Sequence, residues 1–427
     1  MKLIEKKENL SIYMLNNGLK VVLYPIDYCS LFGCSLWIGQ GSSYEKSGEE
    51  GYSHLLEHLT MNLENMYNPE YASAIHEVIH KGCIYNAFTN KENTVYHIEG
   101  TKDTYQEQLK LLQNIALSNH EFDESCFQKE KKVVIQEYYS TMSSFQQISE
   151  RVSGAVWGHQ GIGNPIVGKL KSLEMADKYE MMKFAKQSYC ADNAALVITG
   201  EFPKEIIDCI ERMFSAWDRG SKRSIVNYEK KDYKRNYYHS TELKNGVLGI
   251  GFKGPSYSSV ERIRLQILNE IVAGMFLDSR LYRKIRIGKG AAYNIGSFQN
   301  YYKDRGTFGY ALVCDNQELS GCYRIVMEEL QDVLQNGVEE EELQCAKNRL
   351  ITKRYLEYHN VEKQNILLGS SIMNGTVLTA SMEIDLIHNQ NCDNIDKTAR
   401  KYLSSNNMGI ALISKDDLLL HRKNFIS

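Results

Sequence analysis

The sequence is poor in features that mark special classes of protein. Only five of its 427 residues are proline and no run of 18 apolar residues occurs, so collagen, fibres and wholesale disorder are excluded and no transmembrane helix is expected. The first eight residues lack the apolar segment of a secretory signal. Ten cysteines are scattered without a Cys-x-x-Cys pair, which gives neither a thiolate zinc site nor a disulfide framework. We therefore expect a cytoplasmic protein with reduced cysteines.

An excess of positive or negative charge is also absent. The 50 Lys and Arg residues nearly balance 53 Asp and Glu residues, and no long run of either sign occurs. Neither a nucleic acid nor a membrane surface is therefore expected as a partner. A hydrophobic content of 43% in a chain of this length is typical of a globular protein with two or three domains.

Strand and helix patterns mix along the chain without strict alternation. The asparagine and glycine of residues 16–18 are typical of a turn between two strands. Apolar spacing predicts strands over residues 11–15, 19–24, 31–37 and 93–98, and helices near residues 50–66, 70–80, 102–117 and 121–142. This mixture favours an α+β fold in which each domain has a mostly antiparallel sheet with helices packed on one face.

A loss of apolar periodicity marks a division near the middle of the chain. Residues 216–236 gain charge, and we place a linker there. It separates domains of similar size at residues 1–215 and 237–427. The second half again starts with a strand pattern at 246–252 and a helix pattern at 259–273. We expect two domains of similar fold.

A possible metal motif lies on the predicted helix at residues 50–66. Its apolar side chains recur on one face, and His54, Glu57 and His58 fall on the opposite face with the two imidazoles one turn apart. Two histidines at i and i+4 can bind one Zn²⁺, and the intervening acid can hold and deprotonate a water molecule at the metal. The order His-x-x-Glu-His is that of the inverzincins. The alternative is an ordinary solvated polar face.

A second motif competes with the first. His76, Glu77 and His80 form a His-Glu-x-x-His sequence, which is the zincin order, on the polar side of the helix at 70–80. Its best-spaced third ligand, Glu99, ends a strand pattern, and no downstream histidine extension follows. A zincin centred on these residues remains one alternative, although we expect them to be surface side chains.

A third ligand decides between the two motifs, because catalytic zinc normally takes three protein ligands. In the helix pattern at 121–142, Glu130 and Glu137 both point into an apolar arc. A carboxylate in such surroundings is costly unless it is paired, protonated or bound to a metal. A zinc ion with its histidines would satisfy both acids, which favours the first motif.

These residues resemble a known family. The chain is similar over nearly its whole length to the inverzincin zinc metallopeptidases of the insulinase and pitrilysin family (M16), in particular its short branch related to mitochondrial processing peptidase (M16B). The matching segments are Gly41–Glu45 ahead of Gly51–Leu59, Asn86–Thr89, the Glu-x-x-Val-Val-x-x-Glu pattern that ends at Glu137, Asn164–Gly168, Tyr189–Gly200 and Arg286–Tyr293.

The resemblance implies a role for each matching position. His54, His58 and Glu137 would hold one Zn²⁺ per chain, with Glu57 as the general base and Glu130 orienting a ligand histidine from outside the metal's own ligand set. The substrate would add as an extra β-strand beside Asn86 and Ala87, and Arg286 and Tyr293 of the C-terminal domain would reach its backbone. The resemblance places His76 to His80 in a helix that carries no metal.

The function implied is that of a zinc-dependent endopeptidase. It would cut peptides or unfolded segments inside a chamber formed by a dimer, either a homodimer or a heterodimer with a related M16 subunit, and leader-peptide processing is one activity of this kind. The N-terminal domain would be catalytic and the C-terminal domain would contribute substrate contacts. The alternative is a non-hydrolytic peptide-binding or assembly subunit of a heterodimeric complex of this family.

Overall fold

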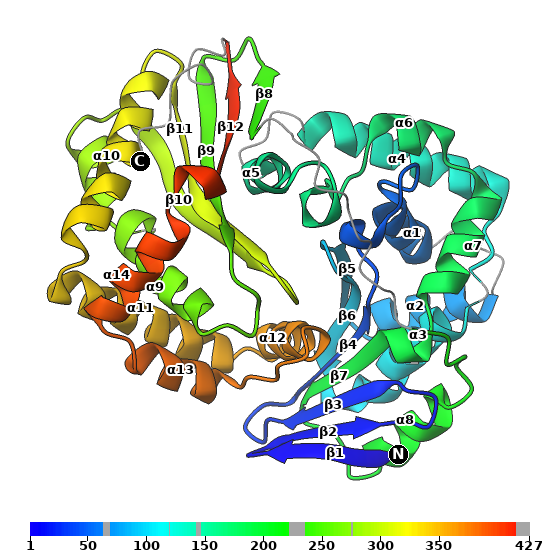
Figure 1. Ribbon diagram of the computed structural model, residues 1–427. Coiled ribbons are helices and arrows are strands. Elements are labelled where there is room, and N and C mark those ends of the chain that lie inside the picture. The colour runs from blue at the N-terminus through cyan, green and yellow to red at the C-terminus, as the bar shows by residue number, and fades with distance from the viewer. Residues whose placement is uncertain (63–68, 119, 142–146, 222–234, 275, 416–427) are drawn as a thin grey trace. The chain divides into compact units, whose positions relative to one another are not determined.

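The computed structural model describes residues 1–62, 69–118, 120–141, 147–221, 235–274 and 276–415 (Figure 1). The chain forms two compact units. The first consists of Met1–Tyr138, Pro165–Asn227 and Leu356–Val377, and the second of Tyr139–Asn164, Tyr228–Tyr355 and Leu378–Ser427. The linker predicted at 216–236 falls largely on residues 222–234, which lie outside the described residues.

The first unit is built on a seven-stranded sheet with the order β1-β2-β3-β7-β4-β6-β5. All neighbouring strands are antiparallel except β3 and β7. The strands are β1 (Lys2–Lys7), β2 (Leu10–Met14), β3 (Lys20–Pro25), β4 (Leu31–Ile38), β5 (Ile84–Thr89), β6 (Thr94–Thr101) and β7 (Ala194–Gly200). Strand β5 is thus an edge strand.

Most helices of the first unit pack on one face of its sheet, where they share a single apolar core with the strands. They are α1 (Tyr52–Met61), α2 (Pro69–His80), α3 (Tyr105–Leu117), α4 (Glu124–Thr141), α6 (Leu170–Met175), α7 (Lys178–Ser188) and α8 (Ile206–Phe214). Because side chains alternate along a strand, every second side chain of the central strands points to the opposite face of the sheet.

The second unit has a five-stranded sheet with the order β10-β11-β9-β12-β8, in which only β12 and β8 are parallel. Its strands are β8 (Asn236–Ser240), β9 (Asn245–Gly254), β10 (Ala292–Tyr301), β11 (Gly306–Asp315) and β12 (Met408–Ser414). Its helices are α5 (Ile148–Trp157), α9 (Glu261–Ala273), α10 (Leu319–Asn336), α11 (Glu340–Tyr358), α13 (Ala380–His388) and α14 (Cys392–Tyr402), together with one π-helical turn, η6 (Tyr282–Ile287).

Each unit receives one helix from the other half of the sequence. Helix α12 (Val361–Met373) covers the second face of the seven-stranded sheet, and α5 covers the second face of the five-stranded sheet. Glycines allow these close approaches: a Cβ on Gly369 would lie 2.0 Å from the Trp37 ring, and one on Gly251 would lie 2.3 Å from Val152. The domain limits predicted from the sequence, 1–215 and 237–427, do not include this exchange of α5 and α12.

The α+β class and the mostly antiparallel sheets are confirmed. The hairpin predicted at 11–24 is β2 and β3, and the predicted helices correspond to α1, α2, α3 and α4. The structure adds a helix on the second face of each sheet, because both faces of the central strands are apolar. No helix in the described ranges is long and apolar enough to cross a bilayer.

Candidate metal centre

Helix α1 begins at a buried carboxylate. Glu45 accepts hydrogen bonds from the backbone N–H groups of Gly51 (2.8 Å) and Ser53 (2.7 Å). The first N–H groups of a helix have no partner inside it, so Glu45 takes the place of a capping residue and fixes where α1 starts. The sequence reasoning gave Glu45 no such role, because its acceptor geometry depends on the turn at residues 46–50.

That turn is held by a second acid. Glu50 accepts hydrogen bonds from Lys169 (2.8 Å) and Ser172 (2.5 Å). Gly51 (φ 102°) and Gly168 (φ 87°) are in the left-handed region, and a Cβ on Gly168 would lie 2.5 Å from the Cα of Gly51. The segment that ends at Gly168 therefore packs directly on the start of the motif helix.

Glu50 gives a prediction for acid stability. Burial raises its pKa, but the hydrogen bonds from Lys169 and Ser172 outweigh this and lower the pKa to about 2. A depressed pKa stabilises the folded state above the unfolded-state value of about 4.3, and this contribution is lost as the pH falls toward 2. We expect Glu50→Gln to lower the free energy of unfolding by about 1 kcal/mol at pH 6. The difference from wild type should shrink at pH 3, in urea unfolding of metal-free protein.

Glu49→Gln is the matched control, because the Glu49 side chain accepts only an exposed hydrogen bond, from the backbone N–H of Lys46 among the contacts described. Its stability should follow that of the wild-type protein at both pH values. A difference between wild type and Glu50→Gln that stays constant from pH 6 to pH 3 would contradict the prediction.

The motif side chains on α1 are not solvated. His54 and Glu57 are each 8% exposed, and His58 is half-buried. Burial of both a histidine and a carboxylate on the face opposite Leu55 and Leu59 excludes the interpretation as an ordinary polar surface. Such groups need specific partners.

Helix α4 supplies those partners from about eighty residues further along the chain. Oε2 of Glu137 lies 3.6 Å from Nε2 of His54 and 3.5 Å from Nε2 of His58. Oε2 of Glu130 lies 3.3 Å from Nδ1 of His58. The structure therefore brings together all four residues that the sequence placed around the metal.

The side chains of His54, His58 and Glu137 fit a zinc ion. One donor atom from each of His54, His58 and Glu137 lies within 4.8 Å of the others, and these are the only such group of three in the described part of the chain. Zinc–ligand distances of 2.0–2.2 Å in a tetrahedron place two donor atoms about 3.4 Å apart. The observed 3.5 and 3.6 Å are close to that value. Two imidazoles and one carboxylate are also a typical ligand set of catalytic zinc.

Proton affinities at the site follow from burial and the two acids. Burial lowers the pKa of His54 to about 4, more than nearby Glu137 raises it. Burial also lowers the pKa of His58, but hydrogen bonds to Glu130 and Glu137 outweigh it and raise the pKa to about 9. The hydrogen bond with His58 in turn lowers the pKa of Glu137. A cation is thus favoured between these side chains, and a metal ion would displace a proton from His58.

Glu57 is held by a residue to which the sequence analysis gave no role. Oγ1 of Thr89, at the end of the edge strand β5, donates a 2.6 Å hydrogen bond to Oε2 of Glu57. Burial raises the pKa of Glu57, and the Thr89 hydrogen bond opposes this increase. Glu57 and His58 line a cavity of about 240 Å³ together with Met61, Asn62 and Glu130.

Asn62 is another partner that the sequence did not reveal. Its Nδ2 donates a 2.5 Å hydrogen bond to Oε1 of Glu130, whose other oxygen faces His58. Glu130 is therefore positioned from two sides. Only the three-dimensional approach of α1 and α4 creates this contact, so no local sequence signal could have indicated it.

Asn86 and Ala87 lie on β5, with β6 as the neighbour on one side. The side chain of Asn86 is exposed, and its Oδ1 accepts the N–H of Ala87 at 2.9 Å. Thr89 connects the same strand to Glu57. An extended peptide could therefore pair with this edge close to the motif helix.

The competing motif lies elsewhere. His76 and His80 on α2 are exposed, and the described residues bring no third ligand to them. Glu99, its best-spaced acid, is on β6, where it is opposite Ile84 of β5.

Arg286 and Tyr293 belong to the second unit. Nη1 of Arg286 donates to the backbone oxygens of Tyr293 (2.8 Å) and Ala292 (3.3 Å), and its guanidinium lies 4.9 Å from the Tyr293 ring centre. Tyr293 is 76% exposed. The two residues form one local pair.

Comparison with known proteins shows the family of the chain. The family model "Insulinase (Peptidase family M16)" matches residues 22–169, and "Peptidase M16 inactive domain" matches residues 176–350. An uncharacterized zinc protease of Rickettsia felis is 29% identical over 415 residues, covering 96% of this chain and 99% of its own length. The beta subunit of the mitochondrial-processing peptidase of Neurospora crassa is 25% identical over 317 residues, covering 70% of this chain and 66% of that subunit.

A solved structure shares the fold. The crystal structure of a protease from Helicobacter pylori superimposes with a TM-score of 0.87 at 17% identity, covering 95% of this chain and 99% of that one. At this level of identity the likeness supports the architecture alone.

Proposed function

Because the chain belongs to the insulinase family of peptidases (M16), we propose that it is a zinc-dependent endopeptidase of the short, M16B-like branch. The observation that carries this proposal is the convergence of three side chains across α1 and α4: Oε2 of Glu137 lies 3.5 Å from Nε2 of His58 and 3.6 Å from Nε2 of His54, and one donor atom of each residue lies within 4.8 Å of the others. The zinc proteases among its relatives support the choice of metal.

His54, His58 and Glu137 would hold one Zn²⁺ per chain. When bound, such an ion polarises the scissile carbonyl and shifts the pKa of water toward neutrality. Glu130 orients His58 through Nδ1, so that Nε2 faces Glu137. Asn62 keeps Glu130 in place.

Glu57 is the general base and acid of the proposed reaction. Its carboxylate takes a proton from the attacking water and returns it to the leaving amine. Thr89 hydrogen bonds to Oε2 of Glu57, which fixes the carboxylate and leaves Oε1 to take the proton. The pKa of Glu57 is raised by burial, which makes the group a stronger base than an exposed carboxylate.

The substrate is an extended peptide. It pairs with the edge strand β5 at Asn86 and Ala87, which directs its backbone toward Thr89 and Glu57. Arg286 and Tyr293 contact the substrate backbone from the C-terminal domain, and the exposure of Tyr293 suits this role. Unfolded segments and short peptides are expected to be preferred over folded proteins.

The active form is a dimer that encloses the substrate. A homodimer and a heterodimer with a related M16 subunit both agree with a chain that carries the metal residues as well as Arg286 and Tyr293. The relative from Neurospora crassa is a subunit of a processing peptidase, which supports peptide processing, including that of leader peptides, as the activity.

The test measures zinc and cleavage on the purified chain, alone and co-expressed with a related M16 subunit. We expect about one zinc per chain and cleavage of quenched-fluorescence peptides, which a chelator abolishes and added Zn²⁺ restores. Gel filtration reports the dimer. A zinc-loaded protein that binds peptides but cleaves none, with or without the partner subunit, would instead identify a non-hydrolytic binding or assembly subunit.

A further inference from the structure

The short segment that carries Arg286 has little apolar anchorage. Between Phe276 and Ile287 only Leu281 and Ile285 are buried apolar side chains. The segment ends in the π-helical turn η6, where the N–H of Gly288 bonds to the carbonyl of Arg283. Such turns are rare and frequently occur at functional sites. Other contacts must therefore hold this turn in one position.

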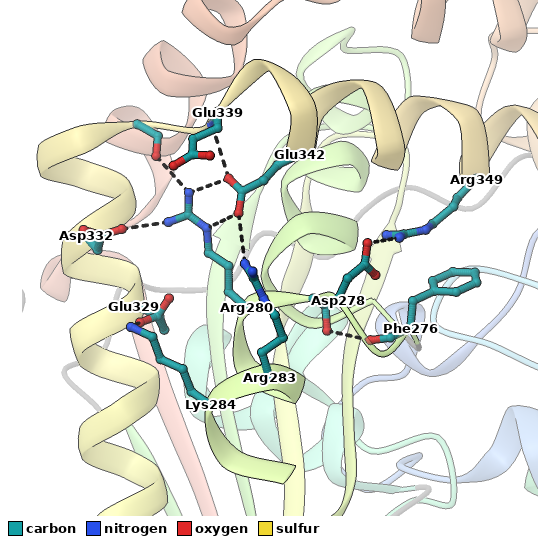
Figure 2. A network of polar contacts seen from close by, with 12 residues as sticks. Phe276, Asp278, Arg280, Arg283, Lys284, Glu329, Asp332, Glu339, Glu342 and Arg349 are labelled. Atoms are coloured by element: carbon teal, nitrogen blue, oxygen red, sulfur yellow. Dashed lines mark hydrogen bonds and ion pairs between the residues drawn. The ribbon is translucent and has the colours of Figure 1, made fainter. Parts of the chain in front are cut away.

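Ion pairs supply those contacts (Figure 2). Asp278, Arg280, Arg283 and Lys284 face α10, α11 and the turn between these helices. Most of the basic groups are exposed: the side chains of Arg283 and Lys284 are 57% and 59% accessible, and the pairs surround a cavity of about 890 Å³. Arg283 is exposed, and Lys284 reaches the buried Glu329 through a single ammonium group, which sets a distance but little orientation.

Arg280 is different because it is buried and makes four hydrogen bonds. Its side chain is only 8% exposed. Nε and Nη2 bond to the two carboxylate oxygens of Glu342 at 2.9 and 2.6 Å, Nη1 bonds to Asp332 at 2.8 Å, and Nη2 also reaches the carbonyl of Gly337 at 3.2 Å. Figure 2 shows the guanidinium between Asp332 and Glu342. A bidentate guanidinium fixes orientation as well as distance, which a lysine cannot reproduce.

Arg280 therefore joins three elements at one point. Asp332 is on α10, Gly337 follows that helix, and Glu342 is in the first turn of α11. Arg280 itself is two residues before η6, and Arg286 is the fifth residue of that turn. The contacts given for Arg286 are local. They reach Ala292, Tyr293 and the Tyr282 ring, so they join Arg286 to Tyr293 but do not attach η6 to α10 or α11.

We propose that Arg280 is the positioning residue of the Arg286–Tyr293 pair: its bonds to Asp332, Gly337 and Glu342 hold η6 in place, so that the pair meets the peptide backbone in a fixed arrangement. This inference rests on the proposed function, in which Arg286 and Tyr293 contact the substrate. Arg280 touches no reacting atom and acts through the Arg286–Tyr293 pair, which the contacts of Arg286 hold together.

The test combines kinetics with hydrogen exchange on the full-length, zinc-loaded chain. Arg280→Lys keeps the charge but loses the bidentate geometry, and we expect it to lower kcat/KM for a quenched peptide about ten-fold, mainly through a higher KM. Backbone amides of residues 282–293 should exchange faster, whereas the zinc content and the exchange of α1 stay unchanged. The control is Arg283→Lys in the same turn, whose 3.7 Å contact with Glu342 is exposed and whose kcat/KM should stay within about two-fold.

A double-mutant cycle separates positioning from general stability. Because Arg280 acts through Arg286, Arg280→Lys should have no further effect on kcat/KM in an Arg286→Ala background. An equal loss in both backgrounds, or unchanged exchange at 282–293, would show that Arg280 only stabilises the fold and would overturn the proposal. Glu342→Gln, which removes the bidentate partner while keeping its shape, should give the same pattern if Arg280→Lys fails to fold.

Failure of the proposed function gives a different result. A wild-type chain that cleaves no peptide would remove the endopeptidase assignment, but the exchange measurement would still decide whether Arg280 holds η6. If wild type cleaves peptides and Arg286→Ala has wild-type kcat/KM, the pair does not contact substrate, and the positioning role is overturned while the zinc peptidase assignment remains.

Discussion

Replacing Glu57 with glutamine is expected to lower kcat for peptide cleavage by about 10³-fold or more while leaving the zinc content unchanged. Glutamine has the shape of glutamate, and its side-chain oxygen can still accept the 2.6 Å hydrogen bond from Thr89. It cannot accept a proton from water or return one to the leaving amine. Steady-state kinetics on quenched peptides, with zinc measured on the same sample by elemental analysis, checks the prediction.

The chain offers a matched control in the competing motif. Glu77→Gln makes the same chemical change in the His-Glu-x-x-His sequence of α2, between two exposed histidines. We expect wild-type kcat and KM for this variant. Full activity of Glu57→Gln, or loss of activity in Glu77→Gln, would contradict the assignment of Glu57 as the base.

Much of this site could be predicted from residue spacing. His54, Glu57 and His58 recur at helical intervals, and Glu130 and Glu137 stand out because a carboxylate directed into an apolar stripe needs a partner. The structure brings His54 and His58 within 3.5–3.6 Å of Glu137, and His58 within 3.3 Å of Glu130. Helical periodicity is a local property of the chain, so it carries this information without knowledge of the fold.

The hydrogen bonds that orient Glu57 and Glu130 could not be predicted from residue spacing. Thr89 reaches Glu57 from a strand 32 residues later, and Asn62 reaches Glu130 across 68 residues. Threonine in a strand and asparagine after a helix are common in any sequence. Only the packing of α1 against α4 and β5 gives them a role.

The exchange of helices α5 and α12 was missed for a related reason. Both helices have an apolar stripe, and a stripe does not specify which sheet it will cover. The decisive features are glycines that leave space, such as Gly251 beneath Val152 and Gly369 beside Trp37. A glycine in a strand or helix pattern has many explanations, so its meaning becomes clear only when the partner is known.

Substitution of the proposed zinc ligands should give the largest loss of zinc. His58→Ala is expected to reduce the metal content after dialysis from about one zinc per chain to less than about 0.1, because a structural or catalytic zinc rarely stays with two protein ligands. His54→Ala and Glu137→Gln should behave alike, since each side chain supplies one of the three converging atoms. Elemental analysis of the dialysed protein measures this.

Two further variants make the series quantitative. Glu130→Gln removes the charge beside Nδ1 of His58 without removing a ligand, and we expect about a 10- to 100-fold weaker zinc affinity in competition with a chelator. His76→Ala should bind zinc as tightly as wild type, because His76 is exposed on α2. Zinc affinity should thus fall most when a ligand is lost, less in Glu130→Gln, and not at all in His76→Ala. This order is expected only if the ion lies between α1 and α4. Retention of zinc by His54→Ala together with its loss in His76→Ala would move the metal to α2.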